Sequence, residues 1–212
     1  MGELPDKNLF MICKSLNKQA LSSLPQGYSI KNCRKDEFYI WKAMHFDDSQ
    51  TAAEYDQFME DYFKATFADQ KELFFDRTLF VCDEENIPIA TCLLWKAYNK
   101  FNTIQWFKVV KNYEEQGIGR ALLSSIMKGL DKSDYPIFLH THPSSYRAIK
   151  LYSDFGFQLL SDPGFGIRSN DLEDSLAYLK KHMPKKYFDN LEITKAPESI
   201  VSFLSTIQTV QF

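Results

Sequence analysis

The sequence lacks the features of a secreted, membrane-spanning or disulfide-stabilised protein. Its 212 residues include only four cysteines, which show neither a C-x-x-C pair nor a metal-ligand spacing. The N-terminus lacks the basic region and apolar core of a signal peptide, and no segment reaches the ~20 apolar residues of a membrane-spanning helix. We therefore expect a cytoplasmic protein without a membrane partner. Cys82 and Cys92 are candidates to face each other across a hairpin, but in a reducing compartment we expect buried thiols.

An excess of basic residues is also missing. The formal net charge is −3, whereas nucleic-acid-binding domains usually carry a clustered Lys/Arg face. The basic cluster that does occur lies at a predicted helix end, where cations complement the helix dipole. It comprises Lys180, Lys181, His182, Lys185 and Lys186. We therefore expect no nucleic-acid partner.

The composition fits a folded α/β chain without a separate second domain. Hydrophobic residues make up 44% of the chain, enough for a substantial core. Alternating or apolar runs predict strands at residues 28–33, 78–82, 88–98, 102–110, 135–142 and 157–160. Helical spacing predicts helices at residues 6–24, 35–45 and 51–69, after Gly117, after Pro143, after an Asn170 cap and from Pro197. There are no internal repeats or low-complexity tracts.

Two of the predicted helices carry further signals. A capping box, Thr51-x-x-Glu54, is predicted to open the helix at 51–69. Aromatic and apolar residues line one face of that helix, and their spacing is typical of core packing. They are Tyr55, Phe58, Met59, Tyr62, Phe63 and Phe67.

A glycine-containing turn joins the strand at 102–110 to an amphipathic helix. The turn reads Lys-Asn-Tyr-Glu-Glu-Gln-Gly-Ile-Gly-Arg over residues 111–120. Gly117 and Gly119 allow close approach of the backbone to a ligand, and the N–H groups of the first helical turn favour an anion such as a pyrophosphate. Taken alone, a G-x-G before a helix is weak evidence for a ligand, because turns before helices also use glycine for purely conformational reasons.

The next strand and helix complete a recognisable order. The strand at 135–142 precedes Pro143 and a helix that carries Leu151, Tyr152 and Phe155 and closes on Gly156-Phe157. Over about residues 78–161 this order resembles the GNAT superfamily of acyl-CoA-dependent N-acyltransferases. The resemblance implies a central mixed, mostly antiparallel sheet flanked by helices. We place a GNAT domain at 26–168, an N-terminal helical extension at 1–25 and a C-terminal helical extension at 169–212, packed on the same domain.

The resemblance implies acetyl-CoA as the co-substrate. The loop pattern of the family, Gln/Arg-x-x-Gly-x-Gly/Ala, falls on residues 114–119, and its first position departs from the pattern because Glu114 is acidic. A carboxylate there would repel a pyrophosphate unless Gln116 or Arg120 compensates or Glu114 turns into solvent. The implied cofactor-binding residues are Val109, Val110, Lys111, Glu114, Glu115, Gln116, Gly117, Ile118, Gly119, Arg120, Ser145 and Arg147. Ser145 stands where relatives often have an asparagine; its alternative role is an N-cap.

Catalytic residues are also implied by the resemblance. Tyr152 aligns with the family tyrosine that protonates the departing sulfur, and a neutral phenol suits that role. The structural alternative is a tyrosine that packs against Phe155 and Phe157 with its hydroxyl hydrogen-bonded. The predicted strand at 102–110 has no Asp or Glu where many relatives carry one, so another group must act as the base.

Candidates for the base are His140 and His142, which alternation places on one face of the strand at 135–142. Further candidates are Glu54, Glu60 and Asp61 if the helix at 51–69 bends over the site, although they fall on its polar face, where solvated side chains are expected. Imidazole titrates near neutrality, and His142 is our candidate general base. The alternatives are a satisfied core side chain for His140 and a loop cap for His142. No third ligand accompanies the two histidines, so we expect no metal.

These observations favour one function and leave one alternative. We expect an N-acetyltransferase that transfers the acetyl group of acetyl-CoA to a primary amine of a small molecule or peptide by direct attack in a ternary complex. The alternative is a catalytically degenerate GNAT fold that binds CoA or senses a ligand. The additional terminal helices either cover the sheet of the domain or build a homodimer.

Overall fold

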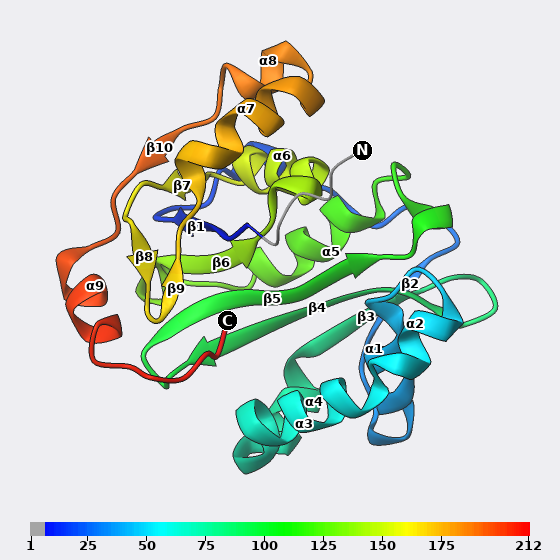
Figure 1. Ribbon diagram of the computed structural model, residues 1–212. Coiled ribbons are helices and arrows are strands. Elements are labelled where there is room, and N and C mark those ends of the chain that lie inside the picture. The colour runs from blue at the N-terminus through cyan, green and yellow to red at the C-terminus, as the bar shows by residue number, and fades with distance from the viewer. Residues whose placement is uncertain (1–6) are drawn as a thin grey trace. The chain divides into compact units, whose positions relative to one another are not determined.

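The computed structural model describes residues 7–212, and they confirm the predicted α/β fold with mixed, mostly antiparallel strands (Figure 1). The residues form two compact units. The central unit comprises Leu21–Lys96 and Ile104–Leu130; the terminal unit comprises the described residues up to Ala20, together with Ala97–Thr103 and Asp131–Phe212. Within residues 7–212, no helix is long and apolar enough to cross a membrane. The domain boundaries at 25 and 168 stay a prediction.

The strands of the central unit follow the predicted meander. They are β2 (Ser29–Asn32), β3 (Thr78–Cys82) and most of β4 (Pro88–Ala97) and β5 (Phe101–Val109), in the order β5-β4-β3-β2. The last residue of β4, Ala97, and the first three of β5 are counted with the terminal unit. Strands β2, β3 and β4 pair antiparallel. Cys92 lies opposite Leu79 and Cys82 lies opposite Pro88, so the suggested facing of the two cysteines is wrong. All four cysteines are buried free thiols, as predicted.

The helices of the central unit are α1 (Phe38–Met44), α2 (Ser49–Glu54), α3 (Asp56–Phe67), α4 (Lys71–Arg77) and α5 (Ile118–Met127). The single helix predicted at 51–69 is therefore interrupted at Tyr55. Its N-terminus is capped by Asp48, whose carboxylate accepts the backbone N–H of Thr51 at 2.8 Å. The predicted capping box is wrong because a better acceptor lies three residues earlier.

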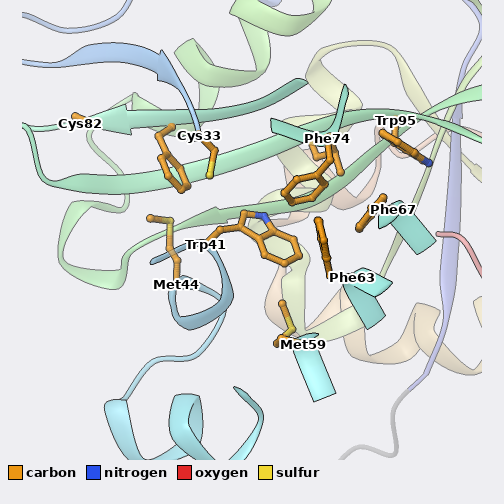
Figure 2. Packing of buried hydrophobic residues seen from close by; sticks show 11 residues of the cluster. Cys33, Trp41, Met44, Met59, Phe63, Phe67, Phe74, Cys82 and Trp95 are labelled. Carbon is orange, nitrogen blue, oxygen red and sulfur yellow. The ribbon is translucent and has the colours of Figure 1, made fainter. Parts of the chain in front are cut away.

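An aromatic core joins α1, α3 and α4 to the strands β3 and β4 (Figure 2). Trp41, Phe67 and Phe74 have no exposed surface, and the Trp41 and Phe74 rings lie 5.0 Å apart, edge to face. In the predicted stripe, Met59, Phe63 and Phe67 are buried, as core residues should be. Tyr55 and Phe58, however, are 48% and 56% exposed, because the helix turns that side of the stripe to solvent.

The terminal unit is built around a strand that the sequence did not predict. Its strands are β1 (Leu9–Cys13), β6 (Ile137–Thr141), β7 (Phe157–Leu160) and β10 (Ile193–Thr194), in the order β10-β7-β1-β6 (Figure 1). Strand β1 pairs antiparallel with β6 and with β7, whereas β10 is parallel to β7. A separate hairpin is formed by β8 (Gly164–Phe165) and β9 (Arg168–Ser169).

The N-terminal helix predicted at 6–24 is thus wrong; its first residue, Asp6, lies outside the described residues. The five residues of β1 are all buried, because the strand lies between two neighbours and is covered on both faces. Such a strand is apolar throughout, and a short apolar run matches helical spacing equally well. Only the 3-10 turn Lys18–Ala20 is helical in the described part of this segment.

The helices of the terminal unit are α6 (Tyr146–Asp154), α7 (Leu172–His182), α8 (Lys185–Phe188) and α9 (Glu198–Leu204). They confirm the helix after Pro143 and the C-terminal helices. Asn170 does not cap α7: the N-cap is Asp171, and the Asn170 amide donates to the carbonyls of Leu160 and Asp162. Further 3-10 turns are Lys35–Glu37, Ala68–Gln70 and Lys111–Tyr113 in the central unit, and Lys132–Asp134 and Pro143–Ser145 in the terminal unit.

Candidate functional site

The glycine-containing turn of the central unit has the predicted strand–turn–helix form. Val110 donates its N–H to the carbonyl of Ile89 at 2.8 Å, and its own carbonyl accepts the N–H of Tyr113 at 2.8 Å. The backbone then passes through a positive φ of 63° at Glu115 and of 83° at Gly117, which is the N-cap of α5. Helix α5 has ten residues, and the N–H groups of its first turn have no partners within the helix.

Gly117 is required by conformation rather than by crowding. Its left-handed backbone is readily adopted only by glycine. A Cβ at this position would meet only Cγ of Pro25, at 3.9 Å, so the space beside the turn is otherwise open. This geometry satisfies the purely conformational explanation and also leaves room for a ligand at the backbone.

The side chains around the turn are largely engaged. The amide of Gln116 donates to the carbonyl of Asn112 at 3.1 Å and accepts the hydroxyl of Tyr28 at 2.9 Å. Glu114 and Arg120 are half-buried, and each interacts with another group of the protein. Gln116 is therefore held by the protein itself, and Glu114 is not simply turned into solvent. Because acidic and basic side chains both surround the turn, its preference for anions depends on the backbone donors and the helix dipole.

In the terminal unit, Tyr152 lies on the buried face of α6. Its side chain is buried, and its ring centroid is 5.9 Å from that of Phe157. The contact with Phe157 that the structural alternative predicted is therefore present, and Tyr152 also has an interaction with another group. A phenol held in this way has a fixed position, which both a structural and a catalytic role require.

The Gly156-Phe157 pair that closes α6 has a clear physical basis. Gly156 has a φ of 96°, and a Cβ there would lie 2.8 Å from the carbonyl oxygen of Ser15. The segment after β1 passes this close because the N–H of Asn17 donates to the carbonyl of Phe155 at 3.0 Å. Glycine is thus needed for both its conformation and its lack of a side chain.

The two predicted cofactor contacts at the start of α6 are exposed. Ser145 occupies the N-cap position, but its hydroxyl makes no capping bond. The guanidinium of Arg147 lies 5.9 Å from the ring centroid of Tyr146. Ser145 therefore has the predicted alternative position without the capping interaction.

His140 and His142 lie together in the terminal unit, with ring centroids 4.8 Å apart. Nε2 of His140 is 2.9 Å from Oδ1 of Asn8, and Nδ1 of His142 is 2.9 Å from the carbonyl oxygen of Lys7. Burial, together with the charges of Arg168 and His142, lowers the pKa of His140 to about 3. His140 is thus a satisfied neutral side chain. Residues 7–212 contain no group of three or more His, Cys, Asp or Glu that could hold a metal.

His45 of the central unit lies in an aromatic cluster. This imidazole lies 5.2 Å from the Trp41 ring and 4.7 Å from the Trp106 ring. Nε2 of His45 and Nε1 of Trp41 are buried without a hydrogen-bond partner. Burial lowers the pKa of His45 to about 3. Trp106 has a φ of 52° inside β5, a strained backbone for a bulky residue. No sequence signal marks this cluster beyond the rarity of histidine.

The comparison with protein-family models gives the family directly. The model of the acetyltransferase (GNAT) family matches residues 38–157, more than half of the chain. The chain belongs to this family. The match includes the turn at 111–120 and Tyr152. In this GNAT chain, strand β1 and the C-terminal helices lie outside the matched residues.

The chain is also similar to solved structures of other proteins, at low sequence identity. A GCN5-related N-acetyltransferase from Sphaerobacter thermophilus is 16% identical, with 74% of this chain and 50% of that chain covered and a TM-score of 0.48. A functionally unknown conserved protein from Staphylococcus epidermidis is 12% identical, with 72% and 57% covered and a TM-score of 0.50. The chain spans about half the length of the first solved structures that it matches. None of the curated proteins compared with it matches.

Proposed function

We propose that this GNAT protein is an N-acetyltransferase that transfers the acetyl group of acetyl-CoA to a primary amine of a small molecule or peptide. The observation that carries the proposal is the turn at 111–120, where Gly117 adopts a left-handed backbone at the start of a ten-residue helix. A pyrophosphate at such a helix start gains from both the N–H groups of the first helical turn and the dipole. The cytoplasmic location, the lack of nucleic-acid and membrane partners, and a homodimer stay predictions.

The proposed contacts to acetyl-CoA follow from this turn. The pyrophosphate would be held by the backbone of the turn, and the extended pantetheine arm would pair with the backbone at the end of β5 and just beyond it. Further contacts are proposed from the exposed start of α6. The residues concerned are Val109, Val110, Lys111, Glu114, Glu115, Gln116, Gly117, Ile118, Gly119, Arg120, Ser145 and Arg147.

The proposed chemistry is a direct attack of the amine on the thioester carbonyl. A C–N bond forms and the C–S bond breaks; His142 takes the proton of the amine, and the Tyr152 hydroxyl gives a proton to the departing thiolate. The state of the cysteines supports direct transfer over an acyl-cysteine intermediate. All four thiols are buried, and desolvation raises the pKa of Cys13 and of Cys33 to about 12. Such thiols supply little thiolate near neutral pH.

The acceptor is proposed to carry an aromatic or apolar group. A series of neighbouring rings runs from the exposed Tyr55 and Phe58 through Tyr62 to Trp106, with centroid separations of 6.2, 6.4 and 5.1 Å. Aromatic surfaces of this kind favour contact with planar, apolar groups. Aromatic amines therefore belong in the panel of acceptors to be tested.

A second candidate function is a GNAT protein that binds CoA or senses a ligand without catalysis. It is favoured by the half-buried Glu114 in the turn and by the lack of a carboxylate in β5. An acidic group near a pyrophosphate would weaken its binding. The two candidates differ in turnover, which an acyltransferase has and a binding protein lacks.

The test is an acetyl-transfer assay in which the release of free CoA is followed with a panel of aromatic, aliphatic and peptide amines. We expect Tyr152→Phe to lower turnover roughly 10²-fold while the affinity for acetyl-CoA changes little. Tyr187→Phe, at an exposed tyrosine of α8, is the matched control and should keep full activity. Binding of acetyl-CoA without transfer to any acceptor would favour the second candidate.

A further inference from the structure

The residues just before β1 hold both histidines of the terminal unit. Oδ1 of Asn8 is 2.9 Å from Nε2 of His140, and the carbonyl oxygen of Lys7 is 2.9 Å from Nδ1 of His142. Two successive residues of one segment thus bind two imidazoles that stand side by side on β6 and its C-terminal extension. The contacts fix the orientation of both rings.

The contact with Lys7 also determines which nitrogen of His142 carries the proton. A carbonyl oxygen can only accept a hydrogen bond, so Nδ1 of His142 must be the protonated, donating nitrogen. In a neutral imidazole the other nitrogen then has a free lone pair. Neutral His142 therefore presents Nε2 as the atom that can accept a proton.

The neighbouring ring, that of His140, does not compete with His142 for the proton. Because the side-chain oxygen of Asn8 is an acceptor, Nε2 of His140 is the donor in their hydrogen bond. Burial lowers the pKa of His140 to about 3, so it remains uncharged near neutral pH. His142 can then take up a proton without a second imidazolium beside it.

The segment that binds the histidines is itself held by the start of α7. Oδ2 of Asp171 accepts the N–H of Asn8 at 2.7 Å, and the N–H of Asp171 donates to the carbonyl of Asn8 at 2.8 Å. One residue earlier, Nζ of Lys7 lies 3.1 Å from a carboxylate oxygen of Asp174. This reciprocal pair and the ion pair fix the carbonyl of Lys7 against His142.

The side chain of Asp171 departs from the usual behaviour of its position. Aspartate is common at helix N-caps because its carboxylate accepts an N–H of the first helical turn. Asp171 is the N-cap of α7 but makes no side-chain capping bond; its carboxylate binds Asn8 instead. A local preference given up in this way indicates that the long-range contact has its own use.

We propose that Asp171 is a positioning residue for the acetyl transfer, which holds the Lys7–Asn8 segment so that neutral His142 carries its proton on Nδ1 and offers Nε2 as the base. This rests on the proposed function for the role of the base, but not for the tautomer itself. In the reaction, Nε2 takes the proton that the attacking amine loses as the C–N bond forms. The resulting imidazolium keeps its Nδ1–H bond to the carbonyl of Lys7, which stabilises the charge.

The test is long-range ¹H–¹⁵N spectroscopy of the full chain labelled in its imidazole rings, at about pH 8, where an ordinary histidine is neutral. The wild type should show His142 protonated on Nδ1. Asp171→Ser keeps a good N-cap for α7 but is too short to bind Asn8, and it should give a mixture of both tautomers. Asp171→Asn retains an acceptor oxygen and should restore the wild-type signal. Glu173→Ala, at the exposed acidic neighbour on α7, is the control and should change nothing.

The outcomes separate this proposal from the proposed function. His142 protonated on Nε2 in the wild type would overturn the proposal, and so would an unchanged Nδ1–H signal in folded Asp171→Ser. If Asp171→Ser fails to fold, the wild-type tautomer and the signal of Asp171→Asn still decide. None of these spectra needs acetyl-CoA or an acceptor, so they are unaffected if no acetyl transfer occurs.

Activity gives a second readout. Asp171→Ser should lower turnover roughly tenfold, the effect typical of losing a partner that orients a functional histidine, with the affinity for acetyl-CoA unchanged. In a His142→Ala background the same substitution should have no further effect, because residues that act as a unit are not additive. A full additional tenfold loss in that background would contradict the positioning role.

Discussion

The hydroxyl of Tyr28 donates a hydrogen bond of 2.9 Å to Oε1 of Gln116. Tyr28 lies just before β2, and Gln116 belongs to the turn that leads into α5. The same amide donates to the carbonyl of Asn112, so one side chain joins two positions of the turn to a neighbouring segment of the central unit. The turn therefore has its shape before any ligand binds, which reduces the entropic cost of binding.

Tyr28→Phe should loosen this turn with little effect on the rest of the protein. The hydrogen bond is exposed, so we expect the free energy of unfolding to fall by about 0.5 kcal/mol, measured by urea denaturation. Acetyl-CoA affinity should fall several-fold, because an ordered turn is lost. Unchanged affinity in the folded variant would show that the Tyr28–Gln116 bond does not preorganise the turn.

Two glycine substitutions should differ in their cost. Gly117→Ala introduces a side chain into open space at a φ of 83°, so only backbone strain of about 1 kcal/mol is expected. Gly156→Ala adds a Cβ 2.8 Å from the carbonyl of Ser15 at a φ of 96°, and should destabilise the protein more, by roughly 2–3 kcal/mol. Thermal or urea unfolding of the two variants measures which one loses more stability. The opposite order would contradict the packing described for β1.

The fold was predictable from sequence wherever a local pattern decided it. The strands β3, β4 and β5 were predicted from their runs of β-branched, aromatic and apolar residues, although the expected alternation of buried and exposed positions is wrong; the helix after Gly117 has a clear apolar face. The prediction for strand β1 was wrong because Leu9–Cys13 is apolar at every position, a pattern that helical spacing also fits. Only its long-range pairing with β6 and β7 identifies it as a strand.

In the candidate site too, features with a local sequence signal could be predicted, whereas contacts between distant residues could not. The turn at 111–120 and the Gly156-Phe157 pair were found because their signals lie within a few neighbouring residues. The contact of Lys7 with His142 joins residues 135 positions apart, and that of Asn8 with Asp171 joins residues 163 positions apart. No spacing rule in a single sequence connects such pairs. His45 was missed for the same reason, because its surroundings depend on the packing of Trp41 and Trp106.

The four cysteines should be unreactive in the native protein. All are buried, and desolvation raises the pKa of Cys92 far above its usual value. A thiol reagent such as a disulfide dye should therefore label no cysteine rapidly until the protein is unfolded in denaturant, when all four react. Rapid labelling of any thiol in the folded protein would contradict this arrangement and reopen an acyl-cysteine route.

The protein should lose stability as the pH falls below about 6.5. Burial lowers the folded-state pKa of His45 to about 3, so between these values the unfolded chain binds a proton that the folded chain excludes. Stability from this group is therefore present above the unfolded pKa and declines by up to about 1.4 kcal/mol per pH unit. Urea denaturation near pH 7 and pH 5 measures the slope, which His45→Gln should reduce. An unchanged slope in His45→Gln would contradict the burial of this ring.

The most direct test of the central claim is a calorimetric titration with acetyl-CoA of the wild type and of two glutamate variants of the same helix. Gly119→Glu places a carboxylate in the first turn of α5, whereas Gly129→Glu makes the same change at an exposed position just beyond the other end. We predict that wild type and Gly129→Glu bind acetyl-CoA and that Gly119→Glu loses binding. No binding by the folded wild type, or equal binding by Gly119→Glu, would contradict the assignment of the turn as the acetyl-CoA site.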